Sequence, residues 1–363
     1  MSDVSQAQVE AQIKNYIDPY LGQDLVSAKA IKNIAIDGGK ITVDVTLGFP
    51  ASGHAAVLSE KVTEQINLVD GVQDVVVNVK SKVINHTVQQ GVKAISGVKN
   101  IIAVASGKGG VGKSTTTANL ALAITAEGGK VGIMDADIYG PSMPRMMGLS
   151  GQPESIDGKS MQPMENYGVQ TMSIGFLIDD ETPMIWRGPM ATQALEQLLN
   201  DTEWTDLDYL LIDLPPGTGD IQLTLSQKVP VSGAVIVTTP QDIALLDARK
   251  GLKMFEKVNV PVLGVVENMS THICSSCGHE EHIFGSGGGE KMSSDYNVDF
   301  LGSLPLDIGI REQADGGKPS VIANPDSRIA EIYGDIARRV TAKLSLQGKD
   351  LASKFPSIVI ENS

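Results

Sequence analysis

The sequence has few cysteines, too little positive charge to balance its acidic residues, and no long hydrophobic run. Only two cysteines occur among its 363 residues, three positions apart, which excludes a framework of disulfides. Lys and Arg number 29 against 43 Asp and Glu, and the resulting net charge of −14 argues against a broad nucleic-acid interface. No apolar run approaches the roughly 18 residues of a membrane-spanning helix, and the first residues lack the basic and apolar regions of a signal peptide. We therefore expect a cytoplasmic protein that binds neither nucleic acid nor membrane.

One glycine-rich stretch carries the clearest functional signal. An apolar run at 101–105 precedes it and a helical pattern at 117–124 follows, and this strand–loop–helix context makes GxxxxGK[ST] a phosphate-binding loop. The lysine before the final serine should reach the β- and γ-phosphates of a nucleotide, and the serine hydroxyl should bind Mg²⁺. The residues that we expect to contact the nucleotide here are Gly107, Lys108, Gly109, Gly110, Val111, Gly112, Lys113, Ser114 and Thr115.

A second lysine, Lys108, lies inside this loop, too close to Lys113 for both to bind the phosphates of one subunit comfortably. Its position suits a contact with a phosphate held by a partner chain. The loop resembles the deviant Walker A motif of the ParA/MinD/nitrogenase-iron-protein class, whose members dimerise over two sandwiched nucleotides. This resemblance implies ATP as the nucleotide, a homodimer, and catalytic roles for Lys108 and Lys113.

The pattern from residue 100 to about 342 alternates strands with helices, which predicts an α/β fold with a mostly parallel sheet covered on both faces. Apolar strands are expected at 131–134, 209–212, 234–237 and 261–266, and each delivers polar residues at its carboxyl end. Open α/β sheets bind their ligands at that edge. We therefore expect the chemistry of the chain to lie there.

Carboxylates follow two of these strands. Asp213 resembles a Walker B aspartate and should hold Mg²⁺ or its bound water, because Mg²⁺ prefers carboxylate oxygens. Asp135 and Asp137 lie two positions apart and share a side if the strand continues. The resemblance implies that Asp137 positions the attacking water and that Asp135 supports Mg²⁺. It also implies that Asn268, after a later strand, hydrogen-bonds adenine, which suits an amide that both donates and accepts.

A second candidate site, separate from the nucleotide loop, is the pair Cys274 and Cys277. This C-x₂-C motif can supply two thiolates to a metal centre. Since four ligands are normally needed, a symmetric dimer could complete a [4Fe–4S] cluster with one pair per chain. Alternatively, histidines could complete a zinc site within one chain, and the candidates are His272, His279 and His282. A redox C-x₂-C is a third option, but the thioredoxin-like unit that usually carries it is missing. The residues alone leave the cluster and zinc open.

The first 90 residues predict a small α+β module, with a hairpin at 31–47, a helix at 55–68 and a strand at 75–79. The module resembles a small domain of iron–sulfur assembly proteins, but its loop at 48–54 has no cysteine. We therefore expect docking or regulation from it, and a polar loop role for His54 rather than metal ligation. The expected boundaries are 1–90 for this domain, 91–99 for a linker, 100–345 for the ATPase domain and 346–363 for a C-terminal tail.

Several linked motifs together resemble the Mrp/ApbC family of iron–sulfur cluster carriers. They are the loop with its extra lysine, 135–142, 213–220, 267–270, the Cys-x-x-Cys-Gly and 283–289. The resemblance implies a P-loop NTPase fold of the SIMIBI/MinD-like type and an ATPase that carries a [4Fe–4S] cluster at a homodimer interface. It also implies transfer to apo-proteins and a scaffold protein as donor. The alternatives are a ParA/MinD-like positioning ATPase, and a zinc-stabilised ATPase without cluster chemistry.

Overall fold

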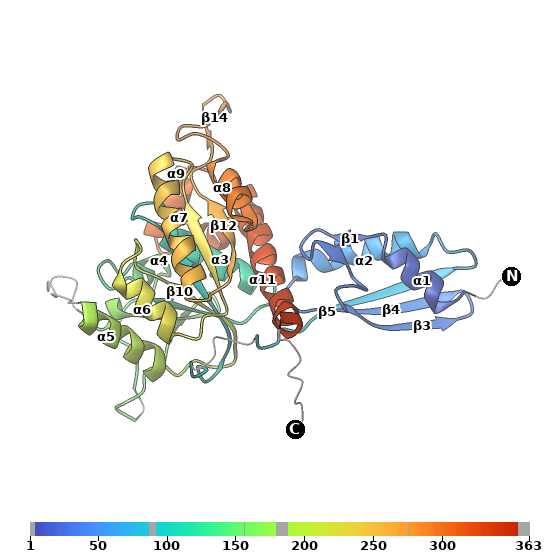
Figure 1. Ribbon diagram of the computed structural model, residues 1–363, viewed down its shortest axis with the longest axis horizontal. Coiled ribbons are helices and arrows are strands. Elements are labelled where there is room, and N and C mark those ends of the chain that lie inside the picture. Colours follow the sequence, from blue (N-terminus) through green and yellow to red (C-terminus); the bar gives the residue numbers. More distant parts are fainter. Residues whose placement is uncertain (1–3, 87–91, 156, 179–187, 275, 355–363) are drawn as a thin grey trace, which may run out of the picture. The chain divides into compact units, whose positions relative to one another are not determined.

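The computed structural model describes residues 4–86, 92–155, 157–178, 188–274 and 276–354. The chain divides into two compact units, which we call unit 1 (residues 1–87 and 341–363) and unit 2 (residues 88–340). Figure 1 shows the elements of both. None of the described helices combines the length and the hydropathy that crossing a bilayer requires.

Unit 1 contains a three-stranded sheet in the order β3-β4-β5, in which β3 and β4 are antiparallel and β4 and β5 parallel. Alternate residues of β4, from Ile41 to Leu47, are buried, and one face of α2 is buried at Leu58, Val62 and Ile66. Buried residues recur at every second position on the strand and at every fourth position on the helix. This is the pattern expected when a helix covers one face of a sheet. Its elements are α1 (Gln6–Ile13), β1 (Ile17–Asp18), β2 (Gln23–Asp24), β3 (Ile31–Asp37), β4 (Lys40–Leu47), α2 (Ser52–Ile66) and β5 (Asp74–Ser81).

The C-terminal helix α11 (Arg328–Lys354) differs from the sequence expectation. The expected tail begins at residue 346, inside this helix, and residues from 341 onward group with unit 1 rather than with the ATPase domain. The reason is packing, because Ala342 is fully excluded from solvent in the hydrophobic core of unit 1. Residue 91 of the expected linker and residues 355–363 of the expected tail lie outside the described residues.

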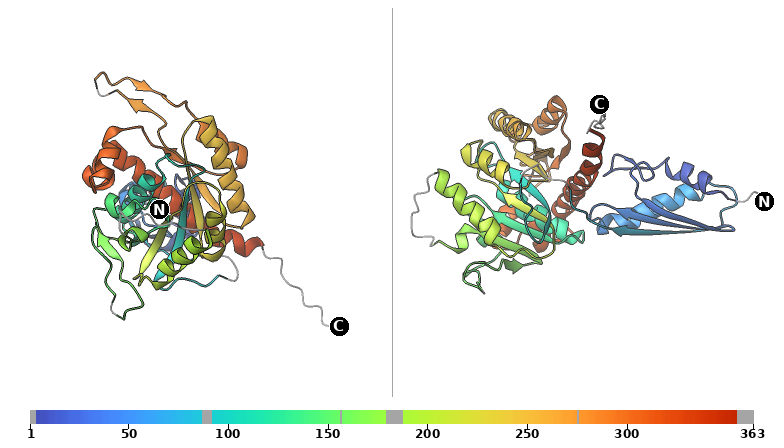
Figure 2. Two further views of the ribbon diagram at one scale, coloured as in Figure 1. Left: turned by 90° about the vertical axis from the view of Figure 1, so that its left-hand side faces the viewer. Right: turned by 60° about the horizontal axis from the view of Figure 1, so that its bottom comes forward.

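Unit 2 is built on an eight-stranded sheet in the order β15-β12-β11-β6-β10-β7-β9-β8, parallel except where β8 joins β9. Figures 1 and 2 show helices on both faces of it. The strands are β6 (Val98–Ala105), β7 (Val131–Asp135), β8 (Met164–Asn166), β9 (Val169–Ser173), β10 (Leu207–Asp213), β11 (Gly233–Thr238), β12 (Val262–Glu267) and β15 (Phe300–Ser303). The helices are α3 (Lys113–Ala126), α4 (Met143–Met146), η1 (Ile174–Phe176), α5 (Gly188–Asp201), α6 (Asp220–Lys228), α7 (Asp242–Lys257), α8 (Gly288–Tyr296), α9 (Ile308–Asp315) and α10 (Ser320–Ala323), with the first part of α11.

The strand before the glycine-rich loop, β6, lies in the middle of the sheet between β10 and β11. The chain continues from β6 to one side through β7 and later to the other side through β11, so the strand order reverses beside β6. In open α/β sheets this reversal leaves a crevice at the carboxyl ends of the strands, where ligands bind. The predicted α/β fold with a mostly parallel sheet is confirmed, whereas strands β8, β9 and β15 were not predicted.

Unit 1 contains a buried polar pair that the sequence did not reveal. His54 lies in the first turn of α2 rather than in a loop, and its Nε2 is 2.9 Å from Oδ2 of Asp18. The other oxygen, Oδ1 of Asp18, accepts the backbone N–H groups of Tyr20 and Leu21, each at 2.9 Å. The ring of Tyr20 meets the His54 ring edge-on, with centroids 4.7 Å apart. This pair ties the β1 turn to α2 inside the core.

We predict that His54→Ala weakens unit 1, because the Asp18 carboxylate stays buried without its partner. The loss should be about 1–3 kcal/mol in the free energy of local opening. Hydrogen exchange of β4 and α2 amides in the full chain measures it, because exchange reports the opening of the region that carries each amide. The control is Lys61→Ala, which removes an exposed ion pair with Glu64 and should cost less than about 0.5 kcal/mol. Equal effects of the two substitutions would contradict the prediction.

Candidate functional site

The glycine-rich loop joins β6 to α3 and leaves the start of the helix free for a ligand. Gly110 and Gly112 both have φ of +82°, a conformation that favours glycine. Gly112 is the N-cap of α3 and has no side chain with which to cap it, so the first N–H groups of the helix can bind an anion. At Gly107 an added Cβ would lie 2.1 Å from a backbone atom of Asp247 in α7. Only glycine allows the loop to pass so close to α7.

Asp213, at the end of β10, brings the predicted loop residues together. Its Oδ1 lies 2.8 Å from Nζ of Lys113, and its Oδ2 accepts the hydroxyl of Ser114 at 2.6 Å. Thr117 also donates its hydroxyl to Oδ1, at 2.8 Å. The Asp213 carboxylate is fully buried, and three polar groups from one turn of α3 satisfy it. Thr117 was not predicted, although it lies one helical turn after Lys113 and so faces the same way.

Asp135 is fully buried at the end of β7, next to Asp213 in the sheet register. Its Oδ2 accepts the N–H groups of Ser142 and Met143 and the hydroxyl of Ser173, all at 3.0 Å. Burial raises the pKa of Asp135 to about 7, and the neighbouring Asp213 carboxylate adds to the rise. The structure thus makes Asp135 the residue that fixes the turn into α4. Ser173, which ends β9, was missed because that strand was not predicted.

Asp137 and Lys108 lie on different sides of the loop. One carboxylate oxygen of Asp137, Oδ2, is 3.8 Å from Nζ of Lys113, and partial burial raises the pKa of Asp137. Nζ of Lys108 instead donates to Oε1 of Gln241, the N-cap of α7, at 3.3 Å. Lys113 therefore belongs to the carboxylate cluster, whereas Lys108 points towards the start of α7.

Asn268, which follows β12, binds the loop rather than open solvent. Its Nδ2 donates to the carbonyl oxygen of Val111 at 2.8 Å, and its Oδ1 accepts the N–H of Met269 at 2.9 Å. A Cβ at Gly112 would lie 2.2 Å from Nδ2, so the amide packs directly against that glycine. The structure brings Asn268 to the nucleotide loop, and its predicted contact with adenine stays a prediction.

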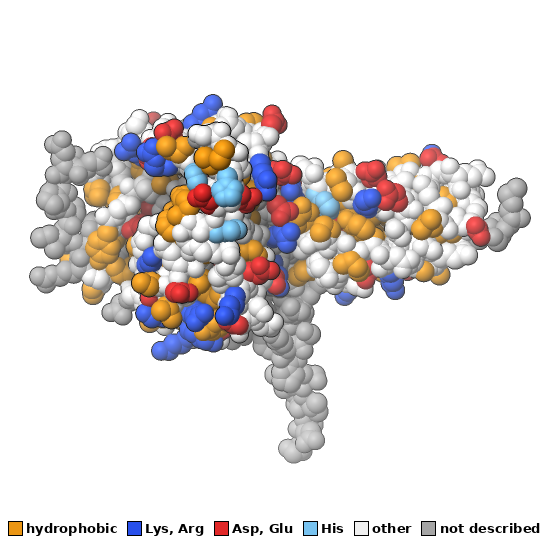
Figure 3. Space-filling model, turned by 90° about the horizontal axis from the view of Figure 1, so that it is seen from above, with side chains coloured by type: hydrophobic (Ala, Val, Ile, Leu, Met, Phe, Trp, Pro, Cys, Tyr) orange, Lys and Arg blue, Asp and Glu red, His pale blue; other side chains and the backbone are white. Residues whose placement is uncertain are grey.

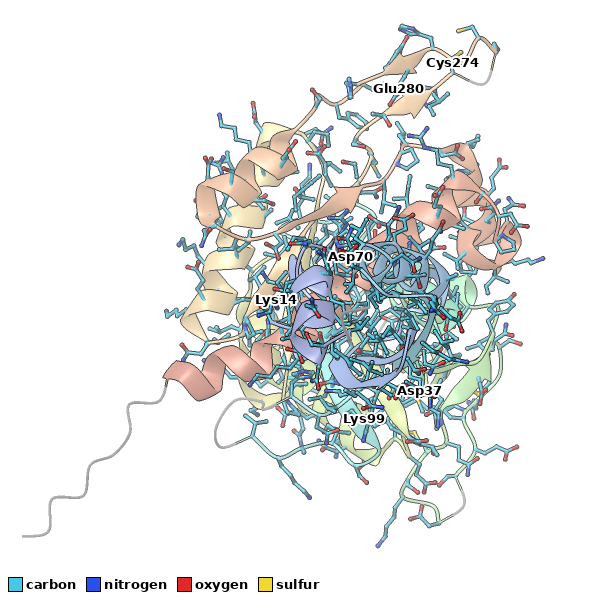
Figure 4. All side chains as sticks on the ribbon, turned by 90° about the vertical axis from the view of Figure 1, so that its right-hand side faces the viewer. Lys14, Asp37, Asp70, Lys99, Cys274 and Glu280 are labelled. Atoms are coloured by element: carbon cyan, nitrogen blue, oxygen red, sulfur yellow. The ribbon has the colours of Figure 1, made fainter. Side chains whose placement is uncertain are left out.

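The cysteines lie on a hairpin made by β13 (His272–Ile273) and β14 (Glu280–Glu281). The N–H of Cys274 donates to the carbonyl of His279 at 2.9 Å, and the N–H of Gly278 donates to the carbonyl of Cys274 at 2.8 Å. Cys274 is partly buried and Cys277 exposed, and both are free thiols. Figure 4 shows Cys274 near the end of the hairpin, where it stands out from the sheet of unit 2.

The turn favours the thiolate form of Cys274. The backbone N–H of Ser276, then the backbone and thiol of Cys277, lower the pKa of Cys274. Thiolates are the form in which cysteine binds metals. The hairpin therefore presents two thiols, and donors from its own turn lower the pKa of one of them, Cys274.

The three histidines near the hairpin do not complete a site with these thiols. Nδ1 of His272 and Nδ1 of His282 lie 3.1 and 3.0 Å from the carbonyl oxygens of Leu306 and Ser270, and His279 is exposed beside Glu281. Figure 3 shows histidines next to carboxylates and hydrophobic side chains on this face. Among the described residues, no group of three or more His, Cys, Asp or Glu could hold a metal ion.

A cavity of about 440 Å³ lies at the foot of the hairpin. Its lining includes Ile273 and Glu280 from the hairpin strands, Phe300 from β15, and Ile329 and Ile332 from the start of α11. The hairpin thus rests on unit 2 over a partly open space rather than over packed core.

We predict that, without nucleotide or magnesium, the Asp135 carboxyl lowers the stability of unit 2 as the pH rises from about 4 to about 7. The pKa of Asp135 in the folded chain, about 7, lies above its ordinary value. Between these two values the folded chain holds more protons than the unfolded chain, so the free energy of unfolding falls with pH. Asp135→Asn should flatten this slope, and the exposed Asp295→Asn should not. Thermal melts at several pH values measure it, and identical slopes for wild type and Asp135→Asn would contradict it.

Comparison with known proteins assigns both regions to families. Residues 97–341 match the family described as NUBPL iron-transfer P-loop NTPase, of the ParA type, and residues 6–79 match an iron–sulfur cluster assembly protein family. An iron–sulfur cluster carrier protein of Salmonella typhimurium is 49% identical over 96% of this chain and 94% of its own length. One of Pseudomonas fragi is 61% identical over 75% of this chain and 96% of its own.

A mammalian relative and a solved structure agree with this assignment. The mouse iron–sulfur cluster transfer protein NUBPL is 53% identical over 69% of this chain and 80% of its own. A nucleotide-binding protein of Archaeoglobus fulgidus, solved in complex with ADP, is 38% identical, with a TM-score of 0.56 over 65% of this chain and 92% of its own. The chain belongs to the iron–sulfur cluster carrier family of ParA-type P-loop NTPases.

Proposed function

We propose that this protein binds and hydrolyses ATP and carries a [4Fe–4S] cluster, which a homodimer holds and delivers to apo-proteins in the cytoplasm. The observation that carries this proposal is the hairpin with its two thiols. A [4Fe–4S] cluster takes four cysteine ligands, and the chain has two cysteines in all. A two-fold axis that pairs the hairpins of two chains supplies the other two. A scaffold protein would load the cluster, and membranes and nucleic acids take no part.

The glycine-rich loop fits a nucleotide with magnesium. Loop and helix N–H groups from Gly107 to Thr115 would surround the phosphates, and Lys113 would exchange its contact with Asp213 for the β- and γ-phosphates. Magnesium requires oxygen donors, and the Ser114 hydroxyl and the Asp213 carboxylate, 2.6 Å apart, supply two. When bound, magnesium neutralises charge on the phosphates.

We assign separate roles in ATP hydrolysis to Asp137, Asp135 and Lys108. Asp137 would orient the attacking water, which suits a partly buried carboxylate beside Lys113. Asp135 supports the magnesium site indirectly, through the turn that it holds. Lys108 would leave Gln241 and contact a phosphate in the partner chain, and Asn268 would contact adenine. Two nucleotides would then lie between the two chains.

We predict that Cys274→Ala and Cys277→Ala abolish iron and sulfide loading under oxygen-free conditions and leave ATP affinity unchanged. Lys113→Ala should weaken ATP binding by about tenfold or more, since it removes a charged hydrogen bond to phosphate, and should leave iron loading intact. Metal analysis, the visible absorption spectrum and ATP titration measure these effects. The controls are Ser276→Ala in the cysteine turn and the exposed Lys130→Ala. A cysteine variant with a full iron load, or wild type that carries zinc instead, would contradict the proposal.

We predict that Lys108 acts in trans. Lys108→Ala and Asp137→Asn should each hydrolyse ATP slowly alone, but a mixed dimer has one site with Asp137 of one chain and Lys108 of the other. In an equal mixture that pairs at random, about half of the dimers are mixed, and each mixed dimer has one intact site out of two. The mixture should therefore recover about a quarter of wild-type turnover.

The control mixture for this prediction is Lys113→Ala with Asp137→Asn, both of which serve the site of their own chain. It should recover no activity. If the Lys108→Ala mixture also stays inactive while the chains exchange, Lys108 acts on the phosphates of its own chain and the sandwiched arrangement is wrong.

A further inference from the structure

One side chain, that of Asn268, connects the nucleotide loop to the root of the cysteine hairpin. Asn268 follows directly on β12 and precedes Cys274 by six positions. Its Nδ2 holds the carbonyl oxygen of Val111 in the glycine-rich loop at 2.8 Å. Its backbone N–H donates to the carbonyl of Thr238, also at 2.8 Å, so the residue itself is anchored to the sheet. Asn268 is 9% exposed, so water does not compete freely for this bond.

The same amide fixes the bend that leads into the hairpin. Met269 has a φ of +58°, a left-handed conformation that is unfavourable for a residue with a side chain. Its N–H donates to Oδ1 of Asn268 at 2.9 Å. One side chain therefore both grips the nucleotide loop and holds the strained residue at which the chain turns towards the cysteines.

Both arms of the hairpin are tied to Ser270, the residue that follows this bend. The N–H of Ser270 donates to the carbonyl of Leu304 at 3.0 Å, which anchors the first arm to the end of β15. The carbonyl of Ser270 lies 3.0 Å from Nδ1 of His282, which follows the second arm. A shift of the backbone at 268–270 therefore reaches both strands that carry the Cys274 turn.

We propose that Asn268 is a positioning residue that transmits the occupancy of the phosphate-binding loop to the cysteine hairpin. Val111 lies two residues before Lys113, inside the loop whose N–H groups face the phosphates. Phosphates that fill the loop hold the Val111 carbonyl in one place, and through Asn268 they hold the bend at Met269. The filled loop thus stiffens the root of the hairpin. The proposal rests on the proposed function, because it assigns regulation to the same two sites.

The expected size of the effect follows from the link. Allosteric coupling cannot exceed the free energy of the contacts that differ between the two states. A single buried hydrogen bond between neutral groups corresponds to about a two- to tenfold change in an equilibrium or rate. A larger nucleotide effect on the cysteines would need another route.

The test uses inorganic tripolyphosphate with magnesium, because tripolyphosphate can fill the phosphate-binding loop but carries no adenine. Loss of any contact between Asn268 and adenine then cannot explain the result. The readout is the rate at which iodoacetamide alkylates Cys274 and Cys277 in protein that carries no iron or zinc, with and without saturating magnesium tripolyphosphate. Competition with labelled ADP measures saturation for each protein. We expect about two- to tenfold slower alkylation in wild type when the loop is full, and the same rate with and without tripolyphosphate in Asn268→Ala.

The matched control is Ser270→Ala, which lies in the same turn and loses only a hydroxyl bond to the Leu304 carbonyl. It should respond as wild type does. If Asn268→Ala also responds as wild type does, the link is overturned.

A measurement on wild type alone covers the case in which Asn268→Ala does not fold or does not bind tripolyphosphate. Amide hydrogen exchange of residues 268–273 should slow when tripolyphosphate fills the loop, and unchanged or faster exchange overturns the proposal. Failure of the proposed function looks different. Wild type that carries no iron would end the cluster assignment and leave this link standing, whereas an iron-loaded protein without the response would end only the link.

Discussion

The contact between the buried carboxylate of Asp213 and the first turn of α3 is the interaction on which the nucleotide site depends. Lys113, Ser114 and Thr117 all reach this one carboxylate. A buried carboxylate without such partners would be costly, so the strand and the helix hold each other in place. The same contact sets the lysine and the serine beside the glycine-rich loop, at the edge where the strands end.

The ends of two other strands of the sheet, β7 and β12, place further residues near this contact. The turn after β7 is fixed by Asp135 and presents Asp137 to Lys113. The end of β12 presents Asn268 to the loop and then turns outwards to the cysteines. The hairpin extends from the sheet over a partly open cavity (Figure 4), which would suit the proposed holding and release of a cluster there. In the proposed function, the strand ends bind the nucleotide and the hairpin that extends from β12 holds the cluster.

Much of this could be predicted from the sequence, because motifs of consecutive residues carry it. The glycine-rich loop, Asp213 and the cysteine pair each stand beside a recognisable strand or turn. What could not be predicted depends on contacts between distant segments. Ser173 binds Asp135 only because β9 lies next to β7, and Asn268 meets Val111 across 157 positions. His54 was expected in a loop, but its partner Asp18 lies 36 positions away and draws it into the core. Likewise, no local pattern shows that Ala342 packs in unit 1.

The central claim is that two chains complete what one chain cannot, a four-thiolate site for a cluster. Native mass spectrometry of protein reconstituted with iron and sulfide without oxygen tests it most directly, because it weighs the chains and their cargo together. The account predicts a dimer with the mass of two chains and one [4Fe–4S] cluster, and no cluster on the monomer. A monomer that carries a whole cluster, or one zinc ion bound to each chain, would contradict it.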